Sequence, residues 1–350
     1  MRHSKTYTVE SVTSGHPDKI CDQISDAILD ACLAEDPRSR VAVEAFGGHG
    51  LLVIAGEVTT TANFNAEEIA RKLYRDIGYD NELKIITNIV RQSPDIAQGV
   101  DVGGAGDQGI MYGYATDETP EFLPKAVVLS HKLARGLEDL RRNSQKFSWL
   151  RPDGKTQVTI VDEKIQAVLI STQHAESVDQ NFIKKELSES LIGPALGDIS
   201  NLEIFVNPTG RFVQGGFEAD TGLTGRKIMV DTYGGLIPHG GGCFSGKDPT
   251  KVDRSAAYMA RFAAKNIVAS GISPECLISV AYAIGKAEPL MLEAMNKNGE
   301  DISEHVRNTF DFRPAAIIER LNLRRPIYLQ TAAYGHFGKP GLPWEEVVNL

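Results

Sequence analysis

The sequence of 350 residues contains only four cysteines, which are widely spaced and form no C-x-x-C pair. Four such residues are too few to cross-link a chain of this length, so a disulfide scaffold is excluded and reduced thiols in a cytoplasmic protein are expected. The chain also lacks the run of about 18–20 apolar residues that a membrane helix requires, and its first residues are polar. We therefore expect no signal peptide, no membrane span and no membrane partner.

An excess of basic residues is absent as well. The chain has 37 Lys and Arg against 46 Asp and Glu, and its formal net charge is −9. Surfaces that bind nucleic acid need clustered cations that acids do not balance, so no nucleic-acid partner is expected. The hydrophobic content of 42% is typical of a globular protein, and the length allows two or three domains.

Several common catalytic motifs are missing. The chain has no G-x-S-x-G, no His and Cys residues at metal-binding spacing, and no G-x-G-x-x-G that directly follows a predicted strand and opens a predicted helix. A serine nucleophile, a zinc site and a Rossmann dinucleotide site therefore have no support. This pattern favours a reaction in which the substrates supply the reactive atoms.

Apolar periodicity and turn residues predict a chain that mixes helices and strands throughout. The predicted helices cover 17–33, 66–77, 124–142, 177–191 and 253–270, followed by two short helices. The predicted strands cover 41–46, 51–60, 84–90, 158–161, 165–171, 203–206, 227–231 and 276–284. The elements fall into three stretches that combine antiparallel strands with helices, which indicates an α+β fold of similar units. The glycine-rich stretch 92–109 is predicted to be a mobile loop.

The strongest local motif is G-G-C-F-S-G-K-D at 241–248, which begins like a P-loop. Asp248 stands where a P-loop needs Ser or Thr for magnesium, and Pro249 interrupts the helix that should follow, so a P-loop NTPase is disfavoured. The glycines still allow backbone N–H groups to approach phosphate oxygens, and Lys247 and Lys251 supply positive charge. We expect a polyphosphate site here, with a tight surface turn as the alternative.

Two further segments place charged residues beside glycines. Arg226 and Lys227 follow a Gly-rich turn and are interpreted either as part of an anion site or as a solvated face. His16 and Asp18 lie at the start of a predicted helix, where the backbone dipole favours anions and a carboxylate can hold Mg²⁺. Asp253 opens a later helix beside the lysine-rich loop, which makes it a second candidate Mg²⁺ ligand.

Other charged residues are ambiguous when considered alone. Glu44 and Glu57 lie inside predicted strands, and solvent-facing positions are the simpler interpretation. Asp153 and Lys155 belong to a D-G-K sequence that is typical of turns. Asp107 lies between glycines, in a turn or in the wall of a site.

Taken together, several segments resemble the S-adenosylmethionine synthetase (methionine adenosyltransferase) family. They are G-H-P-D-K at 15–19, G-A-G-D-Q-G at 104–109, R-P-D-G-K at 151–155, N-P-T-G-R-F at 207–212, G-L-T-G-R-K at 222–227, V-D-T-Y-G-G at 230–235 and G-G-G-C-F-S-G-K-D-P-T-K-V-D at 240–253. They follow the family's order over nearly the whole chain. The resemblance implies an α+β fold of three structurally similar domains, expected at 1–101, 102–213 and 214–350.

The resemblance also implies an activity. ATP and L-methionine would be the substrates, and the methionine sulfur, which needs no base, would attack C5′ of ATP while the tripolyphosphate leaves. The same site would then hydrolyse tripolyphosphate to pyrophosphate and phosphate. Two Mg²⁺ per site and K⁺ would be the cofactors. A homodimer or homotetramer would build active sites shared between subunits.

Site residues are implied where this sequence matches the family's motifs. The ATP and tripolyphosphate site would contain His16, Asp153, Lys155, Arg211, Phe212, Asp220, Arg226, Lys227, Cys243 and Lys247. The catalytic residues among them would be His16, Lys155, Arg226 and Lys247, and Phe212 would lie against the adenine. Methionine would be held by Glu57, Gln92, Asp220 and Lys251, with Asp107 near both substrates. The metal ligands would be Asp18 and Asp253 for Mg²⁺ and Glu44 for K⁺.

The sequence departs from the family's common pattern in three places. Cys243 stands where Ala is common, Ser14 stands where Glu is usual, and the loop that begins at Gln92 is several residues shorter than in the common bacterial form. The short loop is expected to affect gating of the site rather than the chemistry. A noncatalytic regulatory subunit is the alternative, but such a chain is expected to lose charged site residues that are all present here.

Overall fold

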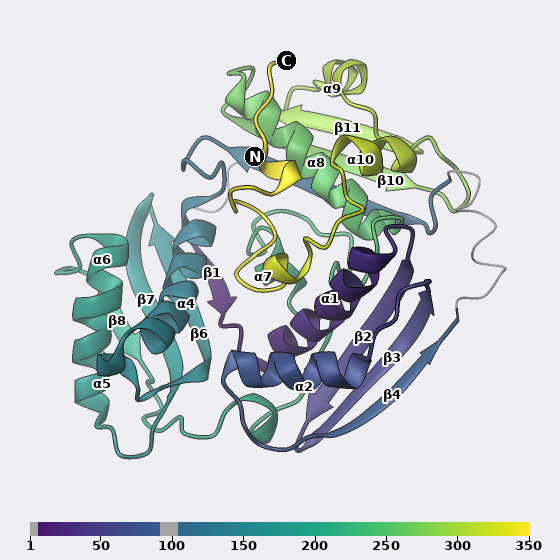
Figure 1. The fold of residues 1–350 in the computed structure, drawn as a ribbon. Coiled ribbons are helices and arrows are strands. Elements are labelled where there is room, and N and C mark those ends of the chain that lie inside the picture. The colour runs from purple at the N-terminus through teal and green to yellow at the C-terminus, as the bar shows by residue number, and fades with distance from the viewer. Residues whose placement is uncertain (1–5, 92–103) are drawn as a thin grey trace.

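The computed structural model describes residues 6–91 and 104–350. They form three β-sheets with helices packed against them, so the predicted α+β class is confirmed (Figure 1). Within these residues, no helix is long and apolar enough to cross a membrane. The predicted loop at 92–109 lies largely outside the described residues.

The first sheet has the strand order β4-β3-β2-β9. Its strands are β2 (Arg40–Gly48), β3 (Leu51–Thr59), β4 (Lys84–Val90) and β9 (Gly222–Leu223). The predicted hairpin of β2 and β3 is confirmed, and β4 runs parallel to β3. Helices α1 (Pro17–Glu35) and α2 (Ala66–Ile77) lie on one side of this sheet, as Figure 1 shows. The opposite side carries Glu44 and Glu57.

The second sheet has the order β1-β6-β7-β8. Its strands are β1 (Thr6–Val12), β6 (Leu150–Val161), β7 (Lys164–His174) and β8 (Glu203–Val206). The long helix α4 (Lys125–Asn143) packs on β1 and β6. The region predicted as one helix at 177–191 forms α5 (Gln180–Leu187), a π-helical turn at Ser188–Ile192 and the short α6 (Gly193–Leu196).

The third sheet has the order β11-β10-β5. Its strands are β5 (Gly109–Thr116), β10 (Glu275–Tyr282) and β11 (Met291–Asn296). Helix α8 (Val252–Ala269) is almost entirely buried and packs against β5 and β10. The two short helices predicted near the C-terminal end are α9 (Ser303–Thr309) and α10 (Pro314–Arg320).

Each sheet includes a strand that is remote in sequence from its other strands. β1 precedes the first sheet along the chain but pairs with β6 in the second. β5 pairs with β10, which lies more than 150 residues later, and β9 pairs with β2. These exchanged strands connect the three sheets, and α1 and the loop after β9 meet where the sheets approach one another.

Two local predictions are wrong. The segment 227–231 is not a strand: Ile228–Asp231 forms the single helical turn α7, which directs the Asp231 carboxylate onto buried Lys19. Asp153 and Lys155 do not form a turn but lie within β6, where Gly154 pairs with Thr172 beside a register shift. In both cases tertiary contacts override the local propensity of the residues.

Candidate active site

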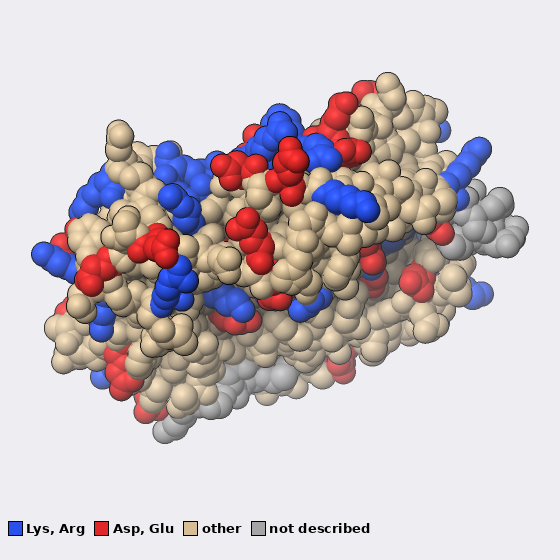
Figure 2. Space-filling view, turned by 90° about the horizontal axis from the view of Figure 1, so that it is seen from below, with Lys and Arg blue, Asp and Glu red and all other residues tan. Residues whose placement is uncertain are grey.

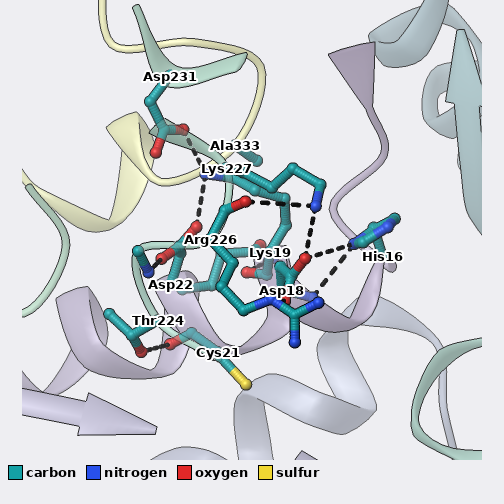
Figure 3. A network of polar contacts seen from close by, with 12 residues as sticks. His16, Asp18, Lys19, Cys21, Asp22, Thr224, Arg226, Lys227, Asp231 and Ala333 are labelled. Atoms are coloured by element: carbon teal, nitrogen blue, oxygen red, sulfur yellow. Dashed lines mark hydrogen bonds and ion pairs between the residues drawn. The ribbon is translucent and has the colours of Figure 1, made fainter. Parts of the chain in front are cut away.

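The first turn of α1 gathers charged residues from separate parts of the chain (Figure 3). Lys227 Nζ lies 2.5 Å from Asp18 Oδ2, and Arg226 Nε lies 3.4 Å from Asp18 Oδ1. The Leu223 N–H also donates to Asp18 Oδ1 at 3.0 Å. Burial alone would raise the pKa of Asp18, but the hydrogen bonds from Lys227 and Leu223 hold it below its usual range. Asp18 is therefore an ionised carboxylate that is held in place by its contacts.

The sequence explains why this turn forms at residue 17. Pro17 suits the first helical position, and His16 caps the helix because its Nδ1 accepts the Asp18 N–H at 3.2 Å. Gly222 lets the strand β9 approach closely, since a Cβ there would lie 2.1 Å from the Pro17 carbonyl oxygen. The motifs at 15–19 and 222–227 thus meet by backbone contact.

His16 is a neutral imidazole at neutral pH. Burial lowers its pKa to about 3, and the positive charges of Lys227 and Lys155 act in the same direction. Because Nδ1 accepts a hydrogen bond from the backbone, the proton lies on Nε2. His16 can therefore donate a hydrogen bond to an anionic oxygen without adding a charge.

The lowered pKa of His16 has a measurable consequence for stability. Between pH 6.5 and about 3 the unfolded chain binds a proton at this residue that the folded chain does not, so acidification destabilises the fold. We expect the stability of the wild type relative to His16→Asn to fall by about 2 kcal/mol between pH 7 and pH 5. Asparagine preserves a capping oxygen.

Urea unfolding of both chains at several pH values measures this difference in stability. Because the two chains share the same carboxylates, the effect of their titration cancels when one stability is subtracted from the other. If the stabilities of the two chains changed with pH in the same way, His16 would not be a neutral, buried residue.

Beneath this cluster lies a buried ion network that the sequence analysis missed. Lys19 is fully buried and lies 2.9 Å from Asp22 and 2.5 Å from Asp231. The Gly225 N–H donates to Asp22 Oδ1 at 2.8 Å, so the network fixes the loop that carries Arg226 and Lys227. A signal was present in the sequence: Asp18, Asp22, Asp26 and Asp30 recur every fourth residue on one face of α1.

The glycine-rich lysine loop reaches the same region. Lys247 Nζ lies 2.6 Å from Asp253 Oδ2 in the first turn of α8. Burial would lower the pKa of Lys247, but the Cys243 thiol and the Asp253 carboxylate raise it, so Lys247 remains a cation. The loop contacts the segment that carries Arg226 and Lys227. A Cβ atom added to Gly225 would lie only 2.7 Å from the Cβ of Cys243.

The loop is built differently from a P-loop. The Gly246 N–H donates to the buried Asp26 carboxylate at 2.8 Å, and the Gly241 N–H donates to His239. Lys251 lies 2.5 Å from buried Asp248, which also accepts the Val41 N–H. The N–H groups of Gly246 and Gly241 are therefore occupied within the chain, unlike those of a P-loop, and both lysines of the loop are held in place by carboxylates.

Strand β6 contributes Asp153 and Lys155. Asp153 is buried, its Oδ2 accepts the Gly216 N–H at 2.8 Å, and burial raises its pKa to about 6. Lys155 is exposed and close enough to act electrostatically on His16, and Asp220 acts on Asp153 in the same way. Lys155 thus lies near the start of α1, and Asp153 lies beside the segment that contains Gly216 and Asp220.

Other predicted residues lie apart from these clusters. Arg211 forms an exposed ion pair with Glu176 at 2.6 Å. The Phe212 N–H donates to the His174 imidazole Nε2 at 3.1 Å, and the Phe212 carbonyl oxygen accepts the His174 N–H at 2.9 Å. Asp107 is exposed and accepts only the neighbouring Gln108 N–H among the described contacts. Gln92 lies outside the described residues.

The two strand glutamates occupy the open face of the first sheet. Glu44 is exposed and Glu57 is half-buried, as a solvent-facing position predicts for a single chain. Glu44 is still close enough to Cys243 and Lys247 to influence the pKa of each. It therefore lies at the edge of the lysine-rich loop.

The chemistry of the carboxylates determines which metals fit. Within residues 6–91 and 104–350, no group of three His, Cys, Asp or Glu side chains is placed to hold a metal ion. Asp18 and Asp253 instead each contact a lysine. Mg²⁺ is commonly held by one or two carboxylates together with substrate phosphates, so this donor set fits a metal that arrives with a nucleotide.

Comparison with known proteins identifies the family. The models of the S-adenosylmethionine synthetase N-terminal, central and C-terminal domains match residues 4–94, 102–212 and 214–346. The S-adenosylmethionine synthase of Pseudothermotoga lettingae is 52% identical over 98% of this chain and 96% of the relative. Those of Sorangium cellulosum and Thermus thermophilus are 51% and 47% identical, over 97% and 99% of this chain and 87% and 97% of the relatives. The chain therefore belongs to the S-adenosylmethionine synthetase family.

Proposed function

We propose that this chain synthesises S-adenosylmethionine from ATP and L-methionine, as a methionine adenosyltransferase. The observation that carries the proposal is the convergence of cations on one place. Arg226 and Lys227 contact Asp18, Lys247 contacts Asp253, and Lys155 acts electrostatically on His16. Family members that are about half identical to this chain are named S-adenosylmethionine synthase.

The reaction explains why cations rather than a base dominate the site. A thioether sulfur is already a nucleophile, so it can attack C5′ of ATP directly. The bond from C5′ to oxygen breaks as the new carbon–sulfur bond forms, and tripolyphosphate leaves with its full negative charge. Lys155, Arg226, Lys227 and Lys247 would stabilise that charge, and His16 would donate its Nε2 hydrogen to a phosphate oxygen.

The same residues suit the second step, in which water cleaves the bound tripolyphosphate into pyrophosphate and phosphate. Asp18 and Asp253 would hold two Mg²⁺, and Glu44 would hold K⁺ at the edge of the loop. When bound, Mg²⁺ would neutralise phosphate charge and orient the chain of phosphates.

Substrate contacts follow the family resemblance. Asp153, Arg211, Phe212, Asp220 and Cys243 would complete the ATP site, with Phe212 against the adenine. Methionine would be held by Glu57, Gln92, Asp220 and Lys251, and Asp107 would lie nearby. The ion pair of Lys251 with Asp248 supports a preorganised position for its ammonium. The domain bounds 1–101, 102–213 and 214–350 and the location in the cytoplasm stay predictions.

A second copy of the chain would complete the site. Glu44 and Glu57 lie on a sheet whose residues Phe46, Ile86 and Val90 are 41%, 44% and 52% exposed. Exposed apolar side chains on a sheet favour burial against another surface. A homodimer, or a homotetramer of two dimers, would cover them and bring Glu57 to the partner's site. The face in Figure 2 intersperses acidic and basic side chains.

The activity is tested by incubating the protein with ATP, methionine, Mg²⁺ and K⁺ and analysing the products by mass spectrometry. A sulfonium product together with phosphate and pyrophosphate is expected. ADP or a phosphorylated methionine would instead indicate phosphoryl transfer, and no product with an intact fold would favour a noncatalytic subunit.

Mixing two damaged chains tests the shared site. Lys247→Ala and Glu57→Ala are each expected to be nearly inactive. If these residues come from different subunits, a mixed dimer has one intact site and one doubly damaged site, so activity is expected to reach about a quarter of wild type.

The quarter arises because half the dimers are mixed and each of these has one working site. Native mass spectrometry of the mixture confirms that the chains exchange. Exchange without recovery would mean that Lys247 and Glu57 serve the same site from one chain.

A further inference from the structure

A surface cavity of about 230 Å³ lies between α4 and residues 334–339 of the C-terminal segment. In Figure 1 this segment is yellow and runs beside α4. Its lining includes the basic side chains of Lys132, Arg135 and Lys339 and the acidic side chain of Glu121, together with His131, whose pKa burial lowers to about 3 so that it carries no charge at neutral pH. The cavity is separate from the residues assigned above to substrates and metals.

The charge of this cavity is not balanced by the chain. Lys339 Nζ donates to the carbonyl oxygens of Gln330 at 2.8 Å and Ala333 at 2.5 Å, and no carboxylate among the described residues pairs with it. Burial lowers the pKa of Lys339 to about 7, the charges of Lys19 and Arg135 add to this effect, and the carboxylates of Asp231 and Asp26 oppose it. Arg135 is exposed and has no hydrogen-bond or ion-pair partner in the described part of the chain. An anion here would relieve this repulsion.

Tyr334 connects the cavity to the candidate active site. Its side chain lines the cavity, and its hydroxyl donates to Glu138 and accepts the Ser14 N–H at 3.1 Å. Ser14 lies two residues before His16. Tyr334 also has a φ of 62°, a left-handed conformation that is unfavourable for a residue with a Cβ and persists only where contacts hold it.

We propose that this cavity is an effector site for a small phosphate-type oxyanion, bound by Arg135, Lys132 and Lys339 and coupled through Tyr334 to Ser14 and His16 at the start of α1. The guanidinium of Arg135 offers paired N–H donors that match a tetrahedral oxyanion. A bound anion would hold the segment at 334–339 against α4 and so keep Ser14 and His16 in place. Occupancy is therefore expected to favour ATP binding.

Binding is tested by calorimetric titration of inorganic phosphate into enzyme saturated with a nonhydrolysable ATP analogue and Mg²⁺, which fills the active site. A second titration with glycerol 3-phosphate shows whether the cavity prefers free phosphate or a phosphate ester. Arg135→Gln is expected to weaken binding about tenfold. Lys125→Gln, on the same helix but outside the cavity, should bind like wild type.

Coupling is tested by the KM for ATP with and without phosphate. In wild type, phosphate is expected to lower this KM about fivefold at low concentration. Arg135→Gln should retain its basal activity and lose the response. Tyr334→Phe should still bind phosphate but lose the response, because it lacks the hydroxyl that contacts Ser14.

Three outcomes would overturn the proposal. Equal phosphate affinity in Arg135→Gln and wild type would exclude this cavity as the site. If Lys125→Gln weakened phosphate binding as much as Arg135→Gln does, the anion would be attracted nonspecifically to the basic helix. A KM response that Tyr334→Phe and Arg135→Gln both retain would place the effect at the catalytic cations, independently of whether the enzyme makes S-adenosylmethionine.

Discussion

Replacing Lys247 with alanine is expected to lower kcat by about a hundredfold to a thousandfold. The ammonium of Lys247 lies 2.6 Å from Asp253 and is only partly exposed, so its position is fixed before substrate binds. Its proposed role is to meet charge that grows on tripolyphosphate as the C5′–oxygen bond breaks. An interaction of this kind stabilises the transition state more than the bound substrates.

The kinetic signature separates this role from substrate binding. The KM for methionine should stay within about twofold of wild type, because the lost cation does not contact the amino acid. Lys247→Arg is the matched control, since it keeps the charge with a different shape, and it should recover part of kcat. An unchanged kcat in Lys247→Ala would remove this residue from the site, and a loss confined to the KM for methionine would assign it to the other substrate.

The substitution Arg254→Leu is expected to lower the free energy of unfolding by about 3–5 kcal/mol. Arg254 and Asp26 are fully buried, and two guanidinium nitrogens lie 2.7 and 2.8 Å from the two carboxylate oxygens. The same guanidinium donates to the Lys247 carbonyl oxygen. Leucine would leave the Asp26 carboxylate without a counter-charge in the core.

The double variant Asp26→Leu, Arg254→Leu is the control. It should be more stable than the single variant, because two apolar side chains leave no buried charge behind. Denaturant unfolding at a fixed protein concentration measures all three chains, since association would otherwise change the apparent stability. If the double variant is the less stable one, the cost comes from lost packing and not from an unpaired charge.

The sequence predicts helices and strands best where one periodicity dominates. The bounds of α2 and of β4 are as predicted, because each is a short segment with clear apolar spacing and turn residues on both sides. Strand β5 was not predicted, since it follows a glycine-rich stretch and contains a further glycine at 113. That glycine packs on α8, where a Cβ would lie 2.0 Å from the backbone of Ala260.

In the candidate site, some residues could be identified from the sequence and others could not. Motif residues such as His16 and Lys247 could be identified because glycines and cations cluster around them in the sequence. The partners that hold them could not, because Asp22, Asp26 and Asp231 appear as ordinary acidic residues until folding buries them. Like charges four residues apart weaken an isolated helix, so the acidic face of α1 is stable only with partners from distant segments.

The exchanged strands also affect how this chain can fold while it is being made. β5 is complete at residue 116, but its partner β10 starts at residue 275, so 275 − 116 = 159 residues separate them. At about 5–20 residues per second, the ribosome needs roughly 10–30 s to supply the missing strand. During that interval β5 has an unpaired edge, and β1 waits in the same way for β6. The nascent chain must therefore be protected from aggregation until most of it has been synthesised.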